Sequence, residues 1–133
     1  MTYEISTDRT RMDVALICRE LQSSYWANNR TSEQVAKSIE NSLCFGVFDK
    51  TNQVGFARVV TDQSTFAYLC DVFIIESERR KGIAQLLMKA VFDHPSLFAV
   101  GWILRTRDAH GLYENFGFSV TTRPERYMER PAV

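Results

Sequence analysis

A long apolar run that leads into a basic, glycine-containing turn constrains the fold more than any other feature of this sequence. The run covers residues 66–75, and a stretch of that length and composition is typical of a strand in the middle of a sheet. Three basic residues and Gly82 follow it, and apolar residues then recur at helical spacing over residues 83–92. The sequence therefore predicts a central strand that passes through a turn into a helix.

The residues before this strand predict two helices and two further strands. Apolar residues recur at helical spacing over residues 9–21, and Thr31 or Ser32 can cap a second helix. Residues 43–48 and 54–61 are apolar runs bounded by turn residues. Together with the central strand, they predict three antiparallel strands joined by tight turns.

The remaining segments complete an α+β pattern, in the order β-α-α-β-β-β-α-β-α-β. The further predicted elements are strands at residues 3–6, 98–106, 118–122 and 127–129 and a short helix at residues 108–116, which Gly117 ends. No linker or convincing repeat divides the chain. We therefore expect one domain over residues 1–133, with a central mixed, mostly antiparallel sheet flanked by helices.

Composition narrows the class of ligand and the cellular setting. The chain has 16 basic and 16 acidic side chains and a formal net charge of zero, which argues against nucleic acid as the main ligand. No run approaches the roughly 20 apolar residues that span a bilayer, and the first residues lack the pattern of a signal peptide. The three cysteines, Cys18, Cys44 and Cys70, lack the spacing of a disulfide framework or a zinc site. These features predict a cytoplasmic protein without a metal.

The basic turn before the third helix is a candidate phosphate site. The first amides of a helix have no internal partners, and the helix dipole adds partial positive charge there. Gly82 lets the backbone approach a ligand closely, and the small Ala84 keeps the first helical turn open. Arg79, Arg80 and Lys81 add charged hydrogen-bond donors. A solvated charged loop would have the same composition, so the turn alone leaves both interpretations open.

A second motif lies downstream, in the segment AHGLYENFGF over residues 109–118. With the basic turn, it resembles the GNAT superfamily, the Gcn5-related N-acetyltransferases. The family pattern Q/R-x-x-G-x-G/A matches Arg79, Gly82 and Ala84. The later pattern A-x-x-L-Y-E-x-x-G-F matches Ala109, Leu112, Tyr113, Glu114, Gly117 and Phe118. The order of predicted elements is also similar, so the resemblance covers nearly the whole chain.

The resemblance implies that acetyl-CoA binds where two central strands splay apart. The pantetheine would pair with the backbone of the central strand, and the pyrophosphate would lie on the amides of the basic turn. The residues implied in cofactor binding are Val72, Phe73, Ile74, Arg79, Arg80, Lys81, Gly82, Ile83, Ala84 and Thr106. Thr106 stands where the family often has Asn, and its hydroxyl can donate only one hydrogen bond. The implied reaction is direct transfer of the acetyl group to an amine in a ternary complex.

Such a transfer needs a neutral amine, a stabilised oxyanion and a proton for the leaving thiolate. Tyr113 is the candidate acid, since a phenol with an unperturbed pKa of about 10 can protonate a thiolate; alternatively, it packs on its helix face. Asp71 interrupts the apolar run, where an unpaired carboxylate is costly. It could deprotonate the amine, hold an ammonium ion, or form an ion pair with Arg58 or Arg105. Glu76, acting through water, and bulk water are the other candidate bases.

The acceptor is the least constrained part of the prediction. Tyr25 and Trp26 lie in the polar connection between the first two helices, where an aromatic wall would suit a cationic or aromatic amine; alternatively, both rings cover the core. The short chain leaves little room for insertions, which favours a small-molecule amine. The terminal strands could pair across two subunits in a homodimer. A second class of function also stays open, a CoA-binding sensor or regulatory domain that transfers nothing.

Overall fold

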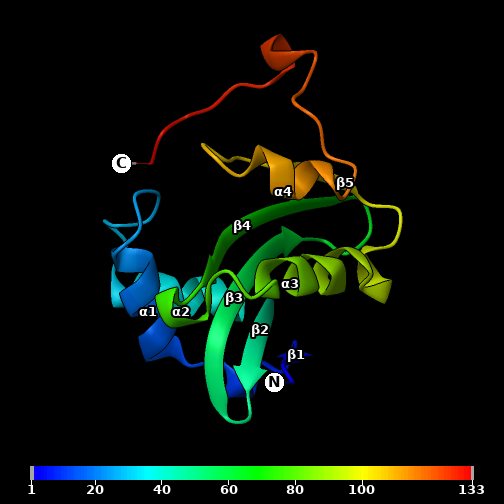
Figure 1. Ribbon diagram of the computed structural model, residues 1–133. Helices are drawn as coiled ribbons and strands as arrows, with labels where there is room; N and C mark the ends of the chain where they lie inside the picture. The colour runs from blue at the N-terminus through cyan, green and yellow to red at the C-terminus, as the bar shows by residue number, and fades with distance from the viewer. Residues whose placement is uncertain (1, 133) are drawn as a thin grey trace.

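The computed structural model describes residues 2–132, and its five strands pair in the order in which they follow one another along the chain (Figure 1). The strands are β1 (Glu4–Ser6), β2 (Leu43–Asp49), β3 (Asn52–Thr61), β4 (Phe66–Ile74) and β5 (Gly101–Leu104). The first four are antiparallel neighbours, whereas β5 pairs with β4 in parallel. The predicted α+β class and the mixed, mostly antiparallel sheet are confirmed.

Within residues 2–132, four α-helices accompany the sheet: α1 (Val14–Gln22), α2 (Ser32–Glu40), α3 (Ile83–Phe92) and α4 (His110–Glu114). The side chain of Asp13 accepts a hydrogen bond from the Leu16 N–H and starts α1, so the helix predicted from residue 9 is divided, with Arg9–Arg11 as a separate 3-10 turn. Thr31 starts α2 with a capping box that Gln34 completes, as predicted. No helix within residues 2–132 is long and apolar enough to cross a membrane.

The sheet separates two apolar cores. The core on one face joins α3 to the sheet and includes Val47 and Leu87, whereas the core on the other face joins α1 and α2 to it and includes Ile17 and Phe48. The neighbours Val47 and Phe48 belong to different cores because successive side chains of a strand point to opposite faces. Figure 1 shows α3 and the α1–α2 pair packed against the sheet. This arrangement holds β3 and β4 rigidly between the two layers.

Strand β4 extends beyond its partner β5. The two strands pair only from Phe66 with Gly101 to Leu69 with Leu104. On its other side β4 stays paired with β3 as far as Ile74 opposite Gly55. Residues 70–74 of β4 therefore have no strand partner on the β5 side, which is the splay expected between the central strands. Strand β5 itself is shorter than the predicted strand at residues 98–106.

The terminal strands predicted at residues 118–122 and 127–129 do not form in the described part of the chain. Phe118 still packs on Phe92 and Trp102, but the residues after it leave the domain. These residues, 119–132, form an extended segment that we call the C-terminal arm, drawn in orange to red (Figure 1). Strand-prone residues need a partner strand, and none of the described strands pairs with the arm.

Candidate functional site

A β-bulge in β4 sets the direction of the Asp71 side chain. The β3–β4 register shifts between Phe56 and Arg58, so one residue of β3 lies opposite both Asp71 and Val72. Asp71 has a φ of 55°, in the left-handed region that aspartate tolerates better than most residues. Because a bulge bends its strand and redirects a side chain, it turns Asp71 out of the regular alternation of β4.

The Asp71 carboxylate connects β4 to β3 and to the segment between α1 and α2. It accepts hydrogen bonds from Arg30 Nη1 at 2.6 Å, Arg58 Nε at 2.8 Å and Trp26 Nε1 at 3.3 Å, and its side chain is 0% exposed. Of the alternatives predicted for Asp71, the structure shows the ion pair with Arg58. Arg105 is not a partner; it lies against the Tyr68 hydroxyl instead. Arg30 was not anticipated, because 41 residues separate it from Asp71.

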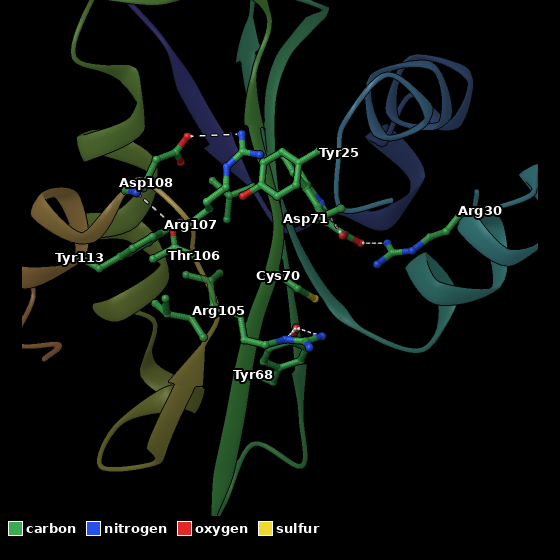
Figure 2. Close-up of a pocket in the computed structure, with 15 residues that line it drawn as sticks. Tyr25, Arg30, Tyr68, Cys70, Asp71, Arg105, Thr106, Arg107, Asp108 and Tyr113 are labelled. Carbon is green, nitrogen blue, oxygen red and sulfur yellow. Dashed lines mark hydrogen bonds and ion pairs between the residues drawn. The ribbon is translucent and has the colours of Figure 1, made fainter. Parts of the chain in front are cut away.

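A cavity of about 590 Å³ lies above this network. It is lined by the α1–α2 connection, by residues 68–72 of β4, by residues 104–109 after β5, and by Tyr113; we call it the acceptor pocket (Figure 2). Its size is within the range of small-molecule sites. Tyr25 and Trp26 line it and are 50% and 42% exposed, so the alternative that they cover the core is wrong.

Tyr113 lies at the boundary of two cavities. It lines the acceptor pocket and a second cavity of about 670 Å³ between β5, α4 and the C-terminal arm. Only 8% of Tyr113 is exposed, and burial, with a smaller contribution from Tyr25, raises its pKa. No fully buried side-chain polar atom of the described residues lacks a hydrogen-bond partner. The Tyr113 hydroxyl has no hydrogen-bond partner among these residues, so it is not fully buried. It must therefore open onto the cavities, while the ring packs near Phe118.

The turn before α3 has the backbone geometry of an anion site. Gly82 precedes the helix with a φ of 78°, and a Cβ at this position would meet no atom within 4 Å. No side chain caps the helix, and its first hydrogen bond runs from the Leu86 N–H to the Gly82 carbonyl at 3.3 Å. The amides of Ile83 and Ala84 thus lie at an open helix start, where they are free of intrahelical partners.

The three basic side chains of this turn differ in the contacts that they make with other residues. Arg79 Nε donates to the Ile74 carbonyl at 2.9 Å, which holds the turn against the end of β4. Lys81 Nζ forms an ion pair with Glu78 at 2.9 Å. Arg80 is exposed, with a φ of 65°, and has no ion pair within residues 2–132. The backbone amides and Arg80 therefore remain the groups most available to a phosphate.

The fold and its order of strands agree with comparisons to known proteins. Residues 10–130 match the family model of the acetyltransferase (GNAT) domain. The chain belongs to the GNAT family of acetyltransferases. A crystal structure of a Xanthomonas campestris protein assigned to this family is 42% identical, with a TM-score of 0.96 over 99% of this chain and 94% of that one.

Two further relatives extend the GNAT comparison. A Gibberella zeae protein assigned as an acetyltransferase is 29% identical over 86% of this chain and 78% of its own length. A Clostridium acetobutylicum protein described as a predicted acetyltransferase with acetyl-CoA shares the fold, with a TM-score of 0.70 at 12% identity over 98% of this chain and 95% of that one.

Thr106 departs from the frequent GNAT asparagine and has a local role that the sequence reading missed. Its Oγ1 accepts a hydrogen bond from the Ala109 N–H at 3.0 Å, immediately before α4. The hydroxyl thereby orders the start of the helix that carries Tyr113 (Figure 2). A threonine three residues ahead of Ala109, the residue before the helix, is the signal that could have revealed this contact.

The acceptor pocket of this GNAT protein contains some of the predicted site residues and not others. Asp71, Val72, Thr106 and Tyr113 line it together. Phe73 and Ile74 lie on the unpaired stretch of β4 with buried side chains, so only their backbone could meet a ligand. The turn residues Arg79, Arg80, Lys81, Gly82, Ile83 and Ala84 lie outside the pocket, past the end of β4.

Proposed function

We propose that this protein is an N-acetyltransferase that transfers the acetyl group of acetyl-CoA directly to an amine. The observation that carries the proposal is the unpaired stretch of β4, residues 70–74. It lies between the open start of α3, suited to a pyrophosphate, and the pocket that receives the Tyr113 hydroxyl. An extended thioester cofactor would contact these three features one after another.

The chain's own groups fit acetyl-CoA. The free backbone edge of Val72 to Ile74 could pair with the amides of the pantetheine, as a further strand would. The absence of a Cβ at Gly82 leaves room for the pyrophosphate against the amides of α3. The relative from Clostridium acetobutylicum, whose structure includes acetyl-CoA, supports this use of the shared fold.

In the proposed reaction the amine nitrogen forms a bond to the thioester carbonyl carbon, and the carbon–sulfur bond breaks. Tyr113 donates its phenolic proton to the leaving sulfur and recovers one from solvent. The backbone N–H groups at the bulge polarise the carbonyl oxygen. The amine loses its proton to water.

Asp71 has a positioning role in this proposal, in place of the proton-accepting role considered from the sequence. The Asp71 carboxylate is bound by Arg30 and Arg58 in two ion pairs, and these pairs stabilise one wall of the acceptor pocket.

The rival function is a CoA-binding sensor that transfers nothing. The test compares wild type with Tyr113→Phe in acetyl-CoA turnover against an amine library and in thermal shift with CoA. A catalyst should lose about a hundredfold in kcat with little change in CoA affinity. Ligand at about 100 times its Kd should stabilise both proteins by roughly 2.7 kcal/mol. Stabilisation without turnover in the wild type would favour the sensor, and no stabilisation at millimolar CoA would reject both functions.

We also propose that the protein pairs with a second copy through the C-terminal arm. Val120, Tyr127 and Met128 on the arm are 73%, 58% and 97% exposed, although all three are apolar or aromatic. Strand β5 pairs on one side only, with β4, and the second cavity separates it from the arm. The arm of a second copy, which includes the strand-prone residues 120–122 and Tyr127, would fit beside β5 and bury the exposed apolar groups.

A further inference from the structure

Arg107 lies at the mouth of the acceptor pocket with its guanidinium stacked on an aromatic ring. Its Cζ lies 3.8 Å from the centroid of the Tyr25 ring. Its contact with the adjacent Asp108 is loose, at 3.8 Å between two side chains that are 66% and 70% exposed. Such an exposed pair contributes little. Stacking fixes the plane of a guanidinium and leaves its N–H groups pointing outward in that plane. In the described residues no acceptor takes a hydrogen bond from Arg107, which lines the pocket and is 66% exposed, so its donors are free to bind a ligand.

The pocket offers a cationic acceptor one exposed carboxylate, that of Asp108, which lies 3.8 Å from Arg107. The Asp71 carboxylate has no exposed surface and is bound by Arg30 and Arg58. The Tyr25 ring, which an aromatic wall for a cation would need, already carries Arg107. Three arginines line the cavity against two aspartates, although the whole chain has a formal net charge of zero. The lining therefore has one more basic than acidic side chain, although Glu129, outside the lining, lies 3.5 Å from Arg105.

We propose that the acceptor amine carries a carboxylate or a phosphate group, which Arg107 binds through two parallel hydrogen bonds. The inference rests on the proposed transfer reaction and assigns its substrate class, for example an α-amino acid or an aminoalkyl phosphate. The anion at Arg107 places the amine deeper in the pocket, between Tyr113 and the bulge of β4. Bidentate guanidinium contacts give this orientation more effectively than a single ammonium contact would.

The phosphates of CoA are a less suitable partner for Arg107. The open start of α3 and the exposed Arg80 lie past the end of β4, whereas Arg107 lies with Tyr25 on the pocket wall (Figure 2). A role in CoA binding would change the Kd for CoA, whereas a role in acceptor binding would change the KM of the acceptor. The two assignments therefore separate in one kinetic experiment.

The experiment measures kcat/KM for matched amines that differ only in the anionic group: phenylalanine against phenethylamine, and aminoethyl phosphate against ethanolamine. We expect the anionic member of at least one pair to be favoured at least tenfold. Arg107→Gln should raise the KM of the anionic member about tenfold. Its kcat, the Kd for CoA and the KM of the amine without the anionic group should stay nearly unchanged. Arg107→Lys should restore only part of the loss, because an ammonium group cannot form the paired contact. Arg19→Gln, an exposed arginine on α1, is the matched control.

Thermal shift of the CoA-loaded protein with N-acetylphenylalanine and with acetylated aminoethyl phosphate provides a readout without turnover. Stabilisation by either product, lost in Arg107→Gln, supports the inference; the pair that responds distinguishes a carboxylate from a phosphate. If the amines without the anionic group are turned over as fast as their anionic partners or faster, the inference is wrong and the proposed function is unaffected. The inference is also wrong if CoA binds but neither acetylated product raises the melting temperature of the CoA-loaded protein. Failure of CoA to bind at all rejects the proposed function, and the substrate class with it.

Discussion

Asp71 forms the most buried charged contact of the site, since its side chain is 0% exposed and two arginines bind it. Removing one partner of a buried ion pair leaves the other charge uncompensated, at a cost of about 3 to 5 kcal/mol. Arg30 is 28% exposed, so water can compensate it in part. We expect Asp71→Asn to lower the free energy of unfolding by about 3 kcal/mol, measured by urea denaturation.

The exposed pair of Lys89 and Asp93 provides the control for this substitution. Asp93 is 62% exposed, and its 2.6 Å contact with Lys89 lies on the surface of α3. Asp93→Asn should change the free energy of unfolding by less than about 1 kcal/mol. If Asp71→Asn were equally mild but abolished turnover, Asp71 would be a proton acceptor, and its positioning role would be wrong.

Cys70 lines the acceptor pocket, yet its chemistry is not that of a nucleophile. Burial, opposed in part by Arg58, raises the pKa of its thiol to about 12. The thiolate, the reactive form, is therefore a very small fraction at neutral pH. We expect iodoacetamide to label Cys70 at least about a hundredfold more slowly than free cysteine at pH 8, with a rate that rises through pH 10. Cys70→Ser identifies the signal, and a rate plateau below pH 9 would contradict the prediction.

For single residues, the sequence was a good guide to which positions belong to the site and a poor guide to the residues that they contact. Asp71 was conspicuous because a carboxylate interrupts an apolar run, and Tyr113 because it lies in a family motif. The pairing of Asp71 with Arg30 depends on where the connection between α1 and α2 folds back onto β4, which no local pattern encodes. The hydrogen bond from the Ala109 N–H to Thr106, before α4, is local, and it could have been predicted.

Among the elements, α3 and its turn were predicted closely because their signals are local. The helix covers Ile83–Phe92, the range that the apolar spacing predicts, with Gly82 before it and Pro95 beyond it. Strand β5 is shorter than predicted because its pairing with β4 stops at Leu104. The length of a strand depends on its neighbour in the sheet, and the sequence of one strand does not contain that information.

The turn also separates the contribution of the backbone from that of side chains. Gly82→Ala places a Cβ where α3 presents its free amides, at a φ of 78° that costs about 1 to 2 kcal/mol for a residue with a side chain. We expect the Kd for CoA, measured by calorimetry, to rise at least about tenfold, because the phosphate contact is both blocked and strained. Lys81→Ala should raise it less than about threefold, since Lys81 is paired with Glu78.

Gly117→Ala is the matched control for backbone strain. Gly117 also has a positive φ, 90°, and a Cβ there would meet no atom within 4 Å. This variant should lose a similar amount of stability while keeping its affinity for CoA. Equal losses of CoA affinity in Gly82→Ala and Lys81→Ala would show that side-chain charge, and not the backbone amides, holds the pyrophosphate.

For the whole molecule, the order of elements was predictable up to α4, because each connection is short and each element carries its own periodicity. The two cores on opposite faces of the sheet follow from the alternation of buried residues in β2 and β3. The predicted terminal strands do not form because no strand of the described residues pairs with residues 118–122 or 127–129. The exposed apolar and aromatic side chains of the arm, Val120, Tyr127 and Met128, are the observation behind the proposed pairing of two copies.

The C-terminal arm makes the assembly testable. We expect light scattering after size exclusion to give twice the 15.3 kDa chain mass for the full protein. Met128→Asp places a charge on a residue that is 97% exposed in the single chain. Because no contact within the chain is lost, any shift to the monomer mass reports burial of this position between copies. Val14→Asp, at a residue 40% exposed on α1, should remain dimeric. A monomer for the full protein, or a dimer that Met128→Asp leaves intact, would show that the arm does not join two copies.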